Sequence, residues 1–368
     1  MNTINTPALG VIEGFFGRSW SWGERQAYAK FFALNKFNFY IYAPKSDAFL
    51  RKYWQQDWPS DIKHELITLH EAYSSAKIDF GIGLSPHEIY IDNSHTSARD
   101  KRLQLSERVK QLNDVSPDIL CLLFDDMRGD IPNLANLQID YMHQVAELST
   151  AKRIIFCPTY YSFDPVLEKV FGTMPENYWQ DLNKNLDKKI DIFWTGEKVC
   201  STEYSTHHLI QVNDLLGRKP FLWDNYPVND GAVKSKLLHL RAVNQSHCRI
   251  QNHVAGHALN PMNQPWLSQL ALASLPRAYR EQSNYNSEKA LVDIATELFI
   301  TEPCGEQLAE ALLQDIPLLQ DKGLGKISEE EKAELIKRYS AFPQNVFCAE
   351  IIDWLNGGYV FDPACLTE

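Results

Sequence analysis

The chain has 368 residues, of which 44% are hydrophobic and 23% are charged, and its net charge is -11. This is an ordinary globular composition, and the length fits one barrel-sized domain with an appendage. The acidic charge argues against a nucleic-acid partner and against docking on anionic lipid, because both need a basic surface.

The N-terminal residues show neither a basic region nor an apolar core of the signal-peptide kind, and no apolar run approaches the length of a membrane span. The seven cysteines are scattered, without a Cys-x-x-Cys pair, and the histidines show no His-Glu-x-x-His spacing. We therefore expect a cytoplasmic protein with reduced thiols, no metal site, no cofactor and no membrane association.

Apolar or β-branched runs of the length of buried strands recur along the first 260 residues. They lie near 9–16, 37–44, 78–85, 119–126, 153–161, 190–196, 219–225 and 252–260. Stretches with helical spacing separate most of them, for example 24–34, 62–75, 98–112 and 134–149. The alternation predicts an α/β fold, a (β/α)8 TIM barrel over residues 8–280. A doubly wound open sheet is the alternative, although no glycine-rich phosphate loop follows any run.

From about residue 285 the pattern changes to amphipathic helices rich in Glu and Lys, at 288–299, 306–320 and 328–339. Ser328 and Glu331 have the spacing of a capping box. Residues 285–368 are predicted to be a helical C-terminal region that packs on the barrel or forms a homodimer. This region shows no catalytic constellation, so we expect it to supply no catalytic group.

Two consecutive carboxylates, Asp125 and Asp126, follow the six apolar residues 119–124. In barrels of parallel strands, the C-terminal ends of the strands carry the chemistry, and paired acids there suit acid catalysis and charge stabilisation. An isolated Asp-Asp pair is more often a helix cap or a solvated turn. Here nearly all of the remaining runs also end in polar or aromatic clusters, which favours one shared site at the mouth of the barrel.

Seven of these clusters, in chain order, resemble the β-N-acetylglucosaminidase domain of family 84 glycoside hydrolases, which includes the O-GlcNAcases and some bacterial hexosaminidases. They are 10–18 (GVIEGFFGR), 42–45 (YAPK), 123–126 (LFDD), 156–159 (FCPT), 194–196 (WTG), 223–230 (WDNYPVND) and 259–261 (LNP). The resemblance covers roughly residues 8–280, and it implies the same (β/α)8 barrel that the strand pattern predicts.

The resemblance implies retaining hydrolysis of terminal β-linked GlcNAc, in which the substrate's own 2-acetamido oxygen attacks the anomeric carbon and forms an oxazoline. Asp125 would orient and polarise the acetamido N–H. Asp126 would protonate the leaving oxygen and then activate water. Adjacent strand residues point to opposite faces, so both acids reach one substrate only if the backbone turns there.

The resemblance also implies binding roles. Tyr161 matches a position beside the acetamido group, and Trp223 or Trp194 would wall the acetamido pocket. Many family members have Glu after Cys-Pro-Thr, whereas this chain has Tyr160 at that position. The difference concerns the shape of the local loop. The residues expected to hold the sugar are Gly14, Lys45, Asn225, Asp230 and Asn260.

Two other functions stay open at this point. One is a catalytically silent barrel that binds GlcNAc for recognition. The other is a hexosaminidase that acts on glycan fragments such as pieces of hyaluronan or peptidoglycan, because the acid pair does not distinguish these substrates. In each case the expected partner is a GlcNAc-bearing glycan or glycoprotein.

Overall fold

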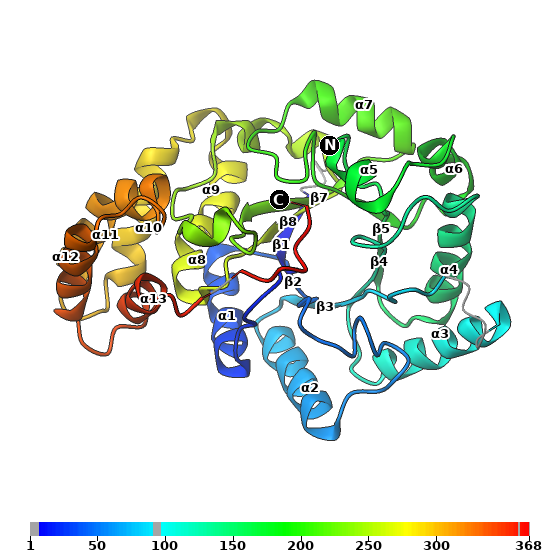
Figure 1. The fold of residues 1–368 in the computed structure, drawn as a ribbon, viewed down its shortest axis with the longest axis horizontal. Coiled ribbons are helices and arrows are strands. Elements are labelled where there is room, and N and C mark those ends of the chain that lie inside the picture. The colour runs from blue at the N-terminus through cyan, green and yellow to red at the C-terminus, as the bar shows by residue number, and fades with distance from the viewer. Residues whose placement is uncertain (1–6, 91–96, 360, 368) are drawn as a thin grey trace, which may run out of the picture.

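A closed barrel of eight parallel strands forms the body of the protein (Figure 1), in a computed structural model that describes residues 7–90, 97–359 and 361–367. Each strand pairs with its neighbours in sequence, and β1 pairs with β8 to close the ring. The predicted (β/α)8 barrel is confirmed, and the open-sheet alternative is wrong. The strands are β1 (Ala8–Glu13), β2 (Phe39–Tyr42), β3 (Asp79–Leu84), β4 (Ile119–Leu123), β5 (Arg153–Cys157), β6 (Asp191–Trp194), β7 (Phe221–Pro227) and β8 (Gly256–Asn260).

Helices surround the strands and continue into the C-terminal region (Figure 1). Those of the barrel are α1 (Trp22–Asn35), α2 (Ser60–Ser75), α3 (Ala98–Asn113), α4 (Leu134–Leu148), α5 (Val166–Phe171), α6 (Tyr178–Asn185), α7 (Thr206–Leu216), α8 (Pro265–Leu272) and α9 (Ser274–Glu281). Four more follow: α10 (Ser287–Phe299), α11 (Gly305–Ile316), α12 (Glu329–Ser340) and α13 (Val346–Leu355). Short turns of 3-10 helix are η1 (Lys234–Lys236), η2 (Gln245–Arg249), η3 (Gln251–His253) and η4 (Gln282–Asn284), and η5 (Pro317–Lys322) is a π-helical turn.

The strands are buried on both faces, which explains why their sequences are continuous apolar runs. All five residues of β4 are buried, for example. Side chains alternate between the barrel interior and the helix layer, so Phe193 packs on Phe221 and Trp223 while its neighbour Trp194 contacts Trp179 of α6.

A buried ion pair fixes the first helix to the first strand. The Arg25 guanidinium of α1 donates to both carboxylate oxygens of Glu13 at the end of β1, at 2.6 and 2.8 Å. Tyr40 of β2 donates to the same carboxylate. Glu13 is fully buried and Arg25 is 3% exposed. Removing one partner would strand the other charge in the core, which costs about 3–5 kcal/mol in comparable sites.

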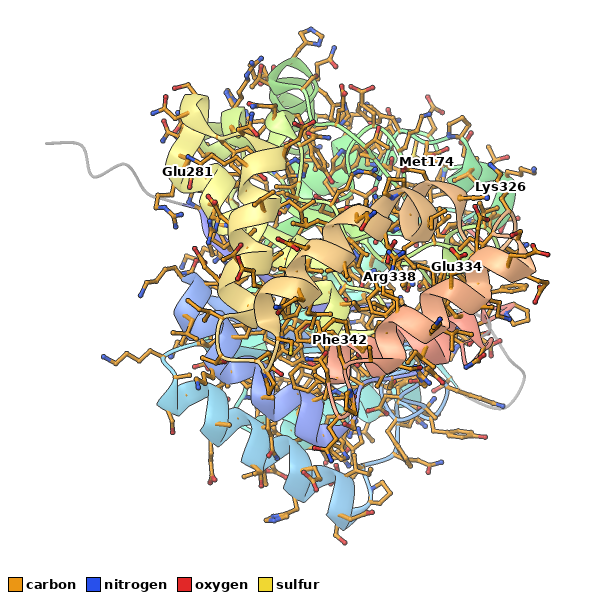
Figure 2. All side chains as sticks on the ribbon, turned by 90° about the vertical axis from the view of Figure 1, so that its left-hand side faces the viewer. Met174, Glu281, Lys326, Glu334, Arg338 and Phe342 are labelled. Atoms are coloured by element: carbon orange, nitrogen blue, oxygen red, sulfur yellow. The ribbon has the colours of Figure 1, made fainter. Side chains whose placement is uncertain are left out.

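The C-terminal helices pack on the outer side of α8 and α9, and Figure 2 shows their outward face, with Glu334 and Arg338 on α12. The predicted helical region is confirmed, as is the capping box of Ser328 and Glu331. The helix expected over 306–320 is present as α11 followed directly by the π-helical turn η5, and the change of hydrogen bonding begins at Pro317, which has no N–H. Helix α13 is an addition that the sequence analysis did not single out.

The apolar stripes of these helices join the same hydrophobic cluster as the barrel strands, with Leu312 and Trp354 as fully buried members. The packing alternative of the sequence analysis is therefore the one that the fold shows, and the homodimer stays a prediction. Among the described residues, none of the helices is both long and apolar enough to span a membrane.

Glu350 anchors α13 to the barrel. Its carboxylate oxygens accept hydrogen bonds from the backbone N–H groups of Trp266 and Leu267, at 3.0 and 2.8 Å, in the first turn of α8. Burial raises the pKa of Glu350 from 4.5 to about 8, although these two N–H groups favour the charged form. The folded state thus binds the proton of Glu350 more tightly than the unfolded chain does.

Glu350 should therefore make the stability pH-dependent. Its contribution is complete below pH 4.5 and is lost as the pH rises toward 8, because the unfolded chain gives up the proton over this range while the folded protein still holds it. Glu350→Gln keeps an acceptor and cannot ionise. The melting temperature of the variant should fall less between these pH values than that of the parent chain. Glu334→Gln, an exposed change on α12, is the control; equal slopes for parent and Glu350→Gln would contradict the assignment.

Candidate active site

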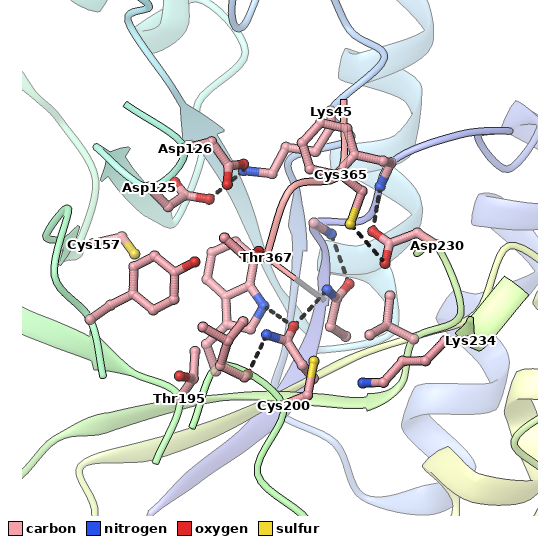
Figure 3. Close-up of a pocket in the computed structure, with 18 residues that line it drawn as sticks. Lys45, Asp125, Asp126, Cys157, Thr195, Cys200, Asp230, Lys234, Cys365 and Thr367 are labelled. Carbon is pink, nitrogen blue, oxygen red and sulfur yellow. Dashed lines mark hydrogen bonds and ion pairs between the residues drawn. The ribbon is translucent and has the colours of Figure 1, made fainter. Parts of the chain in front are cut away.

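A cavity lies at the C-terminal ends of the strands, and nine of the ten residues predicted for the site line it (Figure 3). The strand ends and the loops after them supply almost all of its wall. The predicted residues among them are Gly14, Lys45, Asp125, Asp126, Tyr161, Trp223, Asn225, Asp230 and Asn260. The others are Phe16, Cys157, Thr195, Val199, Cys200, Val228, Lys234, Cys365 and Thr367.

The two carboxylates converge on one ammonium group. Lys45, from the loop after β2, forms ion pairs with Asp125 and with Asp126, the latter at 3.0 Å. Asp126 has φ +58°, a left-handed conformation that turns the backbone directly after Asp125. This turn brings two adjacent side chains to the same cavity, as the sequence analysis required.

One carboxylate oxygen of Asp125 has no hydrogen-bond partner among the described residues. Its Oδ2 pairs with Lys45, whereas its Oδ1 is buried and has no hydrogen-bond partner among the described residues. Burial raises the pKa of Asp125, the charge of Asp126 raises it further, and Lys45 opposes both. A buried acceptor without a donor is costly, so a ligand N–H that reaches Oδ1 would bind favourably.

A chain of amide hydrogen bonds forms the floor of the cavity. The Gly14 N–H donates to Asn260 Oδ1 at 3.2 Å, and Asn260 Nδ2 donates to Asn225 Oδ1 at 3.0 Å. Trp223 Nε1 donates to the same Asn225 oxygen at 3.0 Å. A Cβ added to Gly14 would lie 2.3 Å from the Trp223 ring, so glycine is required here by the indole. The network holds the ring and both amides in fixed orientations.

The irregular end of β7 sets the position of Asn225. The register between β7 and β8 shifts between Asp224 and Pro227, so the intervening backbone departs from the ladder. Beneath it, the buried Asp224 Oδ2 accepts from His247 Nε2 at 2.9 Å and from His257 Nε2 at 3.1 Å. These hydrogen bonds lower the pKa of Asp224 to about 2 against the effect of burial.

Asp224, His247 and His257 are also the one group among the described residues whose ligand atoms lie close enough together to hold a metal ion. Their spacing is that of hydrogen bonds, with one carboxylate oxygen accepting from both rings. The cluster is thus explained as a support for β7, without a metal.

Asp230 lies on the opposite side of the cavity from the acid pair (Figure 3). Its Oδ2 accepts from the Phe16 N–H at 2.8 Å, and its Oδ1 faces Cys365 Sγ at 3.8 Å. Burial raises the pKa of Asp230 to about 6. Its carboxylate therefore stays an acceptor at neutral pH, suited to hydroxyl donors.

Trp194 is not among the residues that line the cavity, so the prediction that it walls the acetamido pocket is wrong. It is fully buried on the helix side of β6, where Nε1 donates to His208 Nε2 at 3.0 Å. Because successive side chains of a strand point to opposite faces, the next residue, Thr195, lines the cavity instead. Trp223 is the indole of the site. Tyr160 also points away, because its hydroxyl donates to the Gly172 carbonyl at 2.6 Å.

The comparisons with known proteins show the family of the chain. A model of the β-N-acetylglucosaminidase family matches residues 9–314. The chain belongs to this family. It is 25% identical over 284 residues to the protein O-GlcNAcases of Rattus norvegicus and Mus musculus, a match that covers 75% of this chain and 30% of theirs.

A mutant of the O-GlcNAc hydrolase of Thermobaculum terrenum has a similar structure, with a TM-score of 0.76 and 27% identity over 94% of this chain and 80% of that one. CpGH84B, at 22% identity and a TM-score of 0.76, covers 95% of this chain and 66% of its own, and supports the fold alone. The chain spans about 30% of the length of the curated relatives.

In this member of the family, the C-terminal region reaches the site, which the sequence analysis did not foresee. Cys365 and Thr367 line the cavity, and Thr367 interacts with the Tyr161 hydroxyl. In Figure 1 this red segment crosses the mouth of the barrel. The tail thus adds two residues to the cavity wall, and the expectation that it supplies no catalytic group stays a prediction. A short segment without periodicity gives no sequence signal of where it will lie.

The segment leaves little room for a ligand. The free volume of the cavity is about 50 Å³, enough for only a few water molecules. Pockets for small molecules usually hold about 300–1,000 Å³. We therefore predict that residues 361–367, which supply Cys365 and Thr367 to the cavity wall, move when a pyranose ring binds.

Deletion of residues 361–368 should strengthen binding of free N-acetylglucosamine, measured by calorimetry. If residues 361–367 lie in the cavity in about nine protein molecules out of ten, the deletion lowers the dissociation constant by roughly tenfold, because the affinity scales with the fraction of molecules whose cavity is open. Leu366→Ala, at a side chain that is 60% exposed, is the control and should change little. Weaker binding after the deletion would instead mean that Cys365 and Thr367 help to hold the sugar.

Proposed function

We propose that the chain is a retaining exo-β-N-acetylglucosaminidase that removes terminal β-linked GlcNAc through an oxazoline intermediate. The observation that carries the proposal is the unfilled buried acceptor Asp125 Oδ1, directly beside Asp126 and at the same ammonium group. Family membership supports the hydrolase activity and the sugar, and the geometry supports the division of roles.

In the first step, Asp125 Oδ1 accepts the acetamido N–H, which makes the carbonyl oxygen more nucleophilic. That oxygen attacks the anomeric carbon as the bond to the aglycone oxygen breaks, and Asp126 gives its proton to the leaving oxygen. In the second step, Asp126 takes a proton from water, the water oxygen attacks the anomeric carbon, and the oxazoline opens. Two displacements at one carbon retain the configuration.

Lys45 makes this division of labour workable. When Asp126 carries its proton, the ammonium group pairs with Asp125 alone and stabilises its charge as the amide N–H is drawn toward it. When Asp126 has lost its proton, Lys45 lies 3.0 Å from its Oδ2 and stabilises the second carboxylate. Without a cation between them, two adjacent carboxylates would raise each other's pKa and hold one proton too tightly.

The remaining wall suits a GlcNAc ring. Asp230 would accept from sugar hydroxyls, with the amides of Asn225 and Asn260 as further partners. Tyr161 would donate to the oxazoline oxygen, and the Trp223 ring would bound the acetamido methyl group. Gly14 acts through the space that it leaves for the indole.

Two finer points are also proposals. The intact acid pair supports an enzyme over a silent GlcNAc-binding barrel, and the natural substrate is either a GlcNAc-modified protein or a glycan fragment. A reducing compartment such as the cytoplasm suits the seven cysteines, all of which are free thiols in the structure.

The mechanism demands the 2-acetamido group. An aryl β-GlcNAc substrate should turn over, whereas the matching aryl β-glucoside should be essentially inert because it carries no internal nucleophile. Release of the aryl alcohol measures both, and the β-GalNAc analogue serves as a control for the sugar ring. Similar rates for the glucoside and the GlcNAc substrate would show that an enzyme carboxylate, with Asp230 the candidate, attacks instead.

The two acids should respond differently to the leaving group. Asp126→Asn should lose about 10²–10⁴-fold in rate on a poor leaving group and much less on a dinitrophenol, which needs little protonation. Asp125→Asn should lose rate with every leaving group, because oxazoline formation always needs the oriented amide. A Brønsted plot over aryl alcohols measures both; parallel plots for the two variants would refute the assignment of roles.

A further inference from the structure

A second and larger cavity borders the active site at Lys45. It is a groove of about 660 Å³ between the loop after β2 and the loop after β3. Two hydrogen bonds hold these loops together: Trp54 Nε1 donates to the His87 carbonyl at 3.2 Å, and the Ser85 N–H donates to the Leu50 carbonyl at 2.8 Å. The groove is therefore preformed rather than a gap between independent loops.

Arg51 stands at the border of the groove and the active site. Its guanidinium carbon lies 5.2 Å from the ring centre of Phe16, a residue of the active-site wall. Its Nε is buried, and it has no hydrogen-bond partner among the described residues. A guanidinium has five donors in a fixed fork that matches carboxylate and phosphate groups. This one is held by stacking and its charge acts on Asp125, while its Nε has no acceptor among the described residues.

The rest of the groove is also cationic, in a chain whose net charge is -11. Lys52 and Lys101 contribute side chains to it, and His87 contributes a ring whose pKa is lowered by burial and by Arg51. Among the described residues of the lining, the one that is acidic is Glu88, which is exposed and lies 3.9 Å from the His87 ring.

We propose that this groove, with Arg51 as its specificity-determining residue, binds an aglycone sugar that carries a carboxylate or a phosphate. The direction follows from Asp126, because the leaving oxygen must lie at the general acid. Asp126 pairs with Lys45 at 3.0 Å, and Lys45 also lines the groove. The aglycone thus leaves the acid pair toward Arg51. This inference rests on the proposed function, which assigns Asp126 its role.

A sugar fits the groove better than a peptide because of Tyr53. Its side chain is 42% exposed at the rim, with the Lys52 ammonium 5.4 Å from its ring centre. An exposed phenol ring beside cations offers an apolar face for the C–H groups of a pyranose and donors for an acidic substituent.

Three disaccharides test the proposal: GlcNAc β-1,4-linked to glucuronate, to glucose 6-phosphate and to glucose. We expect kcat/KM to be about ten- to hundredfold higher for at least one acidic substrate than for the glucose disaccharide, the range of a charge-assisted hydrogen bond. Arg51→Gln should abolish that ratio and Arg51→Lys should restore part of it. The ratio is unaffected by any general loss of activity in a variant.

Arg249→Gln, at an exposed arginine outside the groove, is the matched control and should leave the ratio unchanged. The acidic substrate with the larger loss in Arg51→Gln identifies the natural substituent. Equal rates on all three disaccharides, or an acid preference that survives Arg51→Gln, would overturn the proposal.

Cleavage of an acidic GlcNAc-peptide is a further comparison. If its rate falls in Arg51→Gln while the rates on the acidic disaccharides do not, the proposal is overturned in favour of an acidic polypeptide. If neither these disaccharides nor an aryl β-GlcNAc is cleaved, the proposed function itself has failed.

Discussion

One buried ammonium group makes the active site possible. Lys45 lies between two adjacent carboxylates that are taken out of water, and it is the only cation among the described residues that forms ion pairs with both. Without it, the charges of Asp125 and Asp126 would repel, and the left-handed turn at Asp126 would bring them together at a high cost. The barrel supplies the geometry, because β2 and β4 deliver these residues to the same rim.

The neutral part of the site depends on a different constraint, which is the close approach of Trp223 to the backbone at Gly14. The indole occupies the volume of a missing side chain, and its N–H joins the amide chain that orients Asn225 and Asn260. Mutual support of this kind leaves few rotamers open, so these cavity-lining groups are arranged before a ligand arrives.

Much of this architecture could be predicted from the sequence because it follows from local patterns. Continuous apolar runs mark strands buried on both faces, and the polar residues that end them mark the rim. Asp125 and Asp126 were found in this way, and the ordered motifs identified the other cavity residues. Trp194 was mistaken because a four-residue strand gives no sign of which face is the interior.

What the sequence did not indicate lies outside regular elements. The position of residues 361–367 depends on tertiary contacts far from them in the chain, such as Asp230, and no periodicity records such contacts. Arg51 is of interest because its buried Nε has no acceptor among the described residues. Only the surroundings of the side chain in the structure show this.

The pairing of β1 with β8 has a consequence for how the protein is made. Residues 8–11 find their partners only at 256–259, so the ring cannot close until the ribosome has delivered the eighth strand. Until then β1 presents an open edge. The ion pair of Glu13 and Arg25, with Tyr40, spans fewer than thirty residues of chain and can form early. It would hold the first strand, helix and second strand as one unit while the rest of the chain is synthesised.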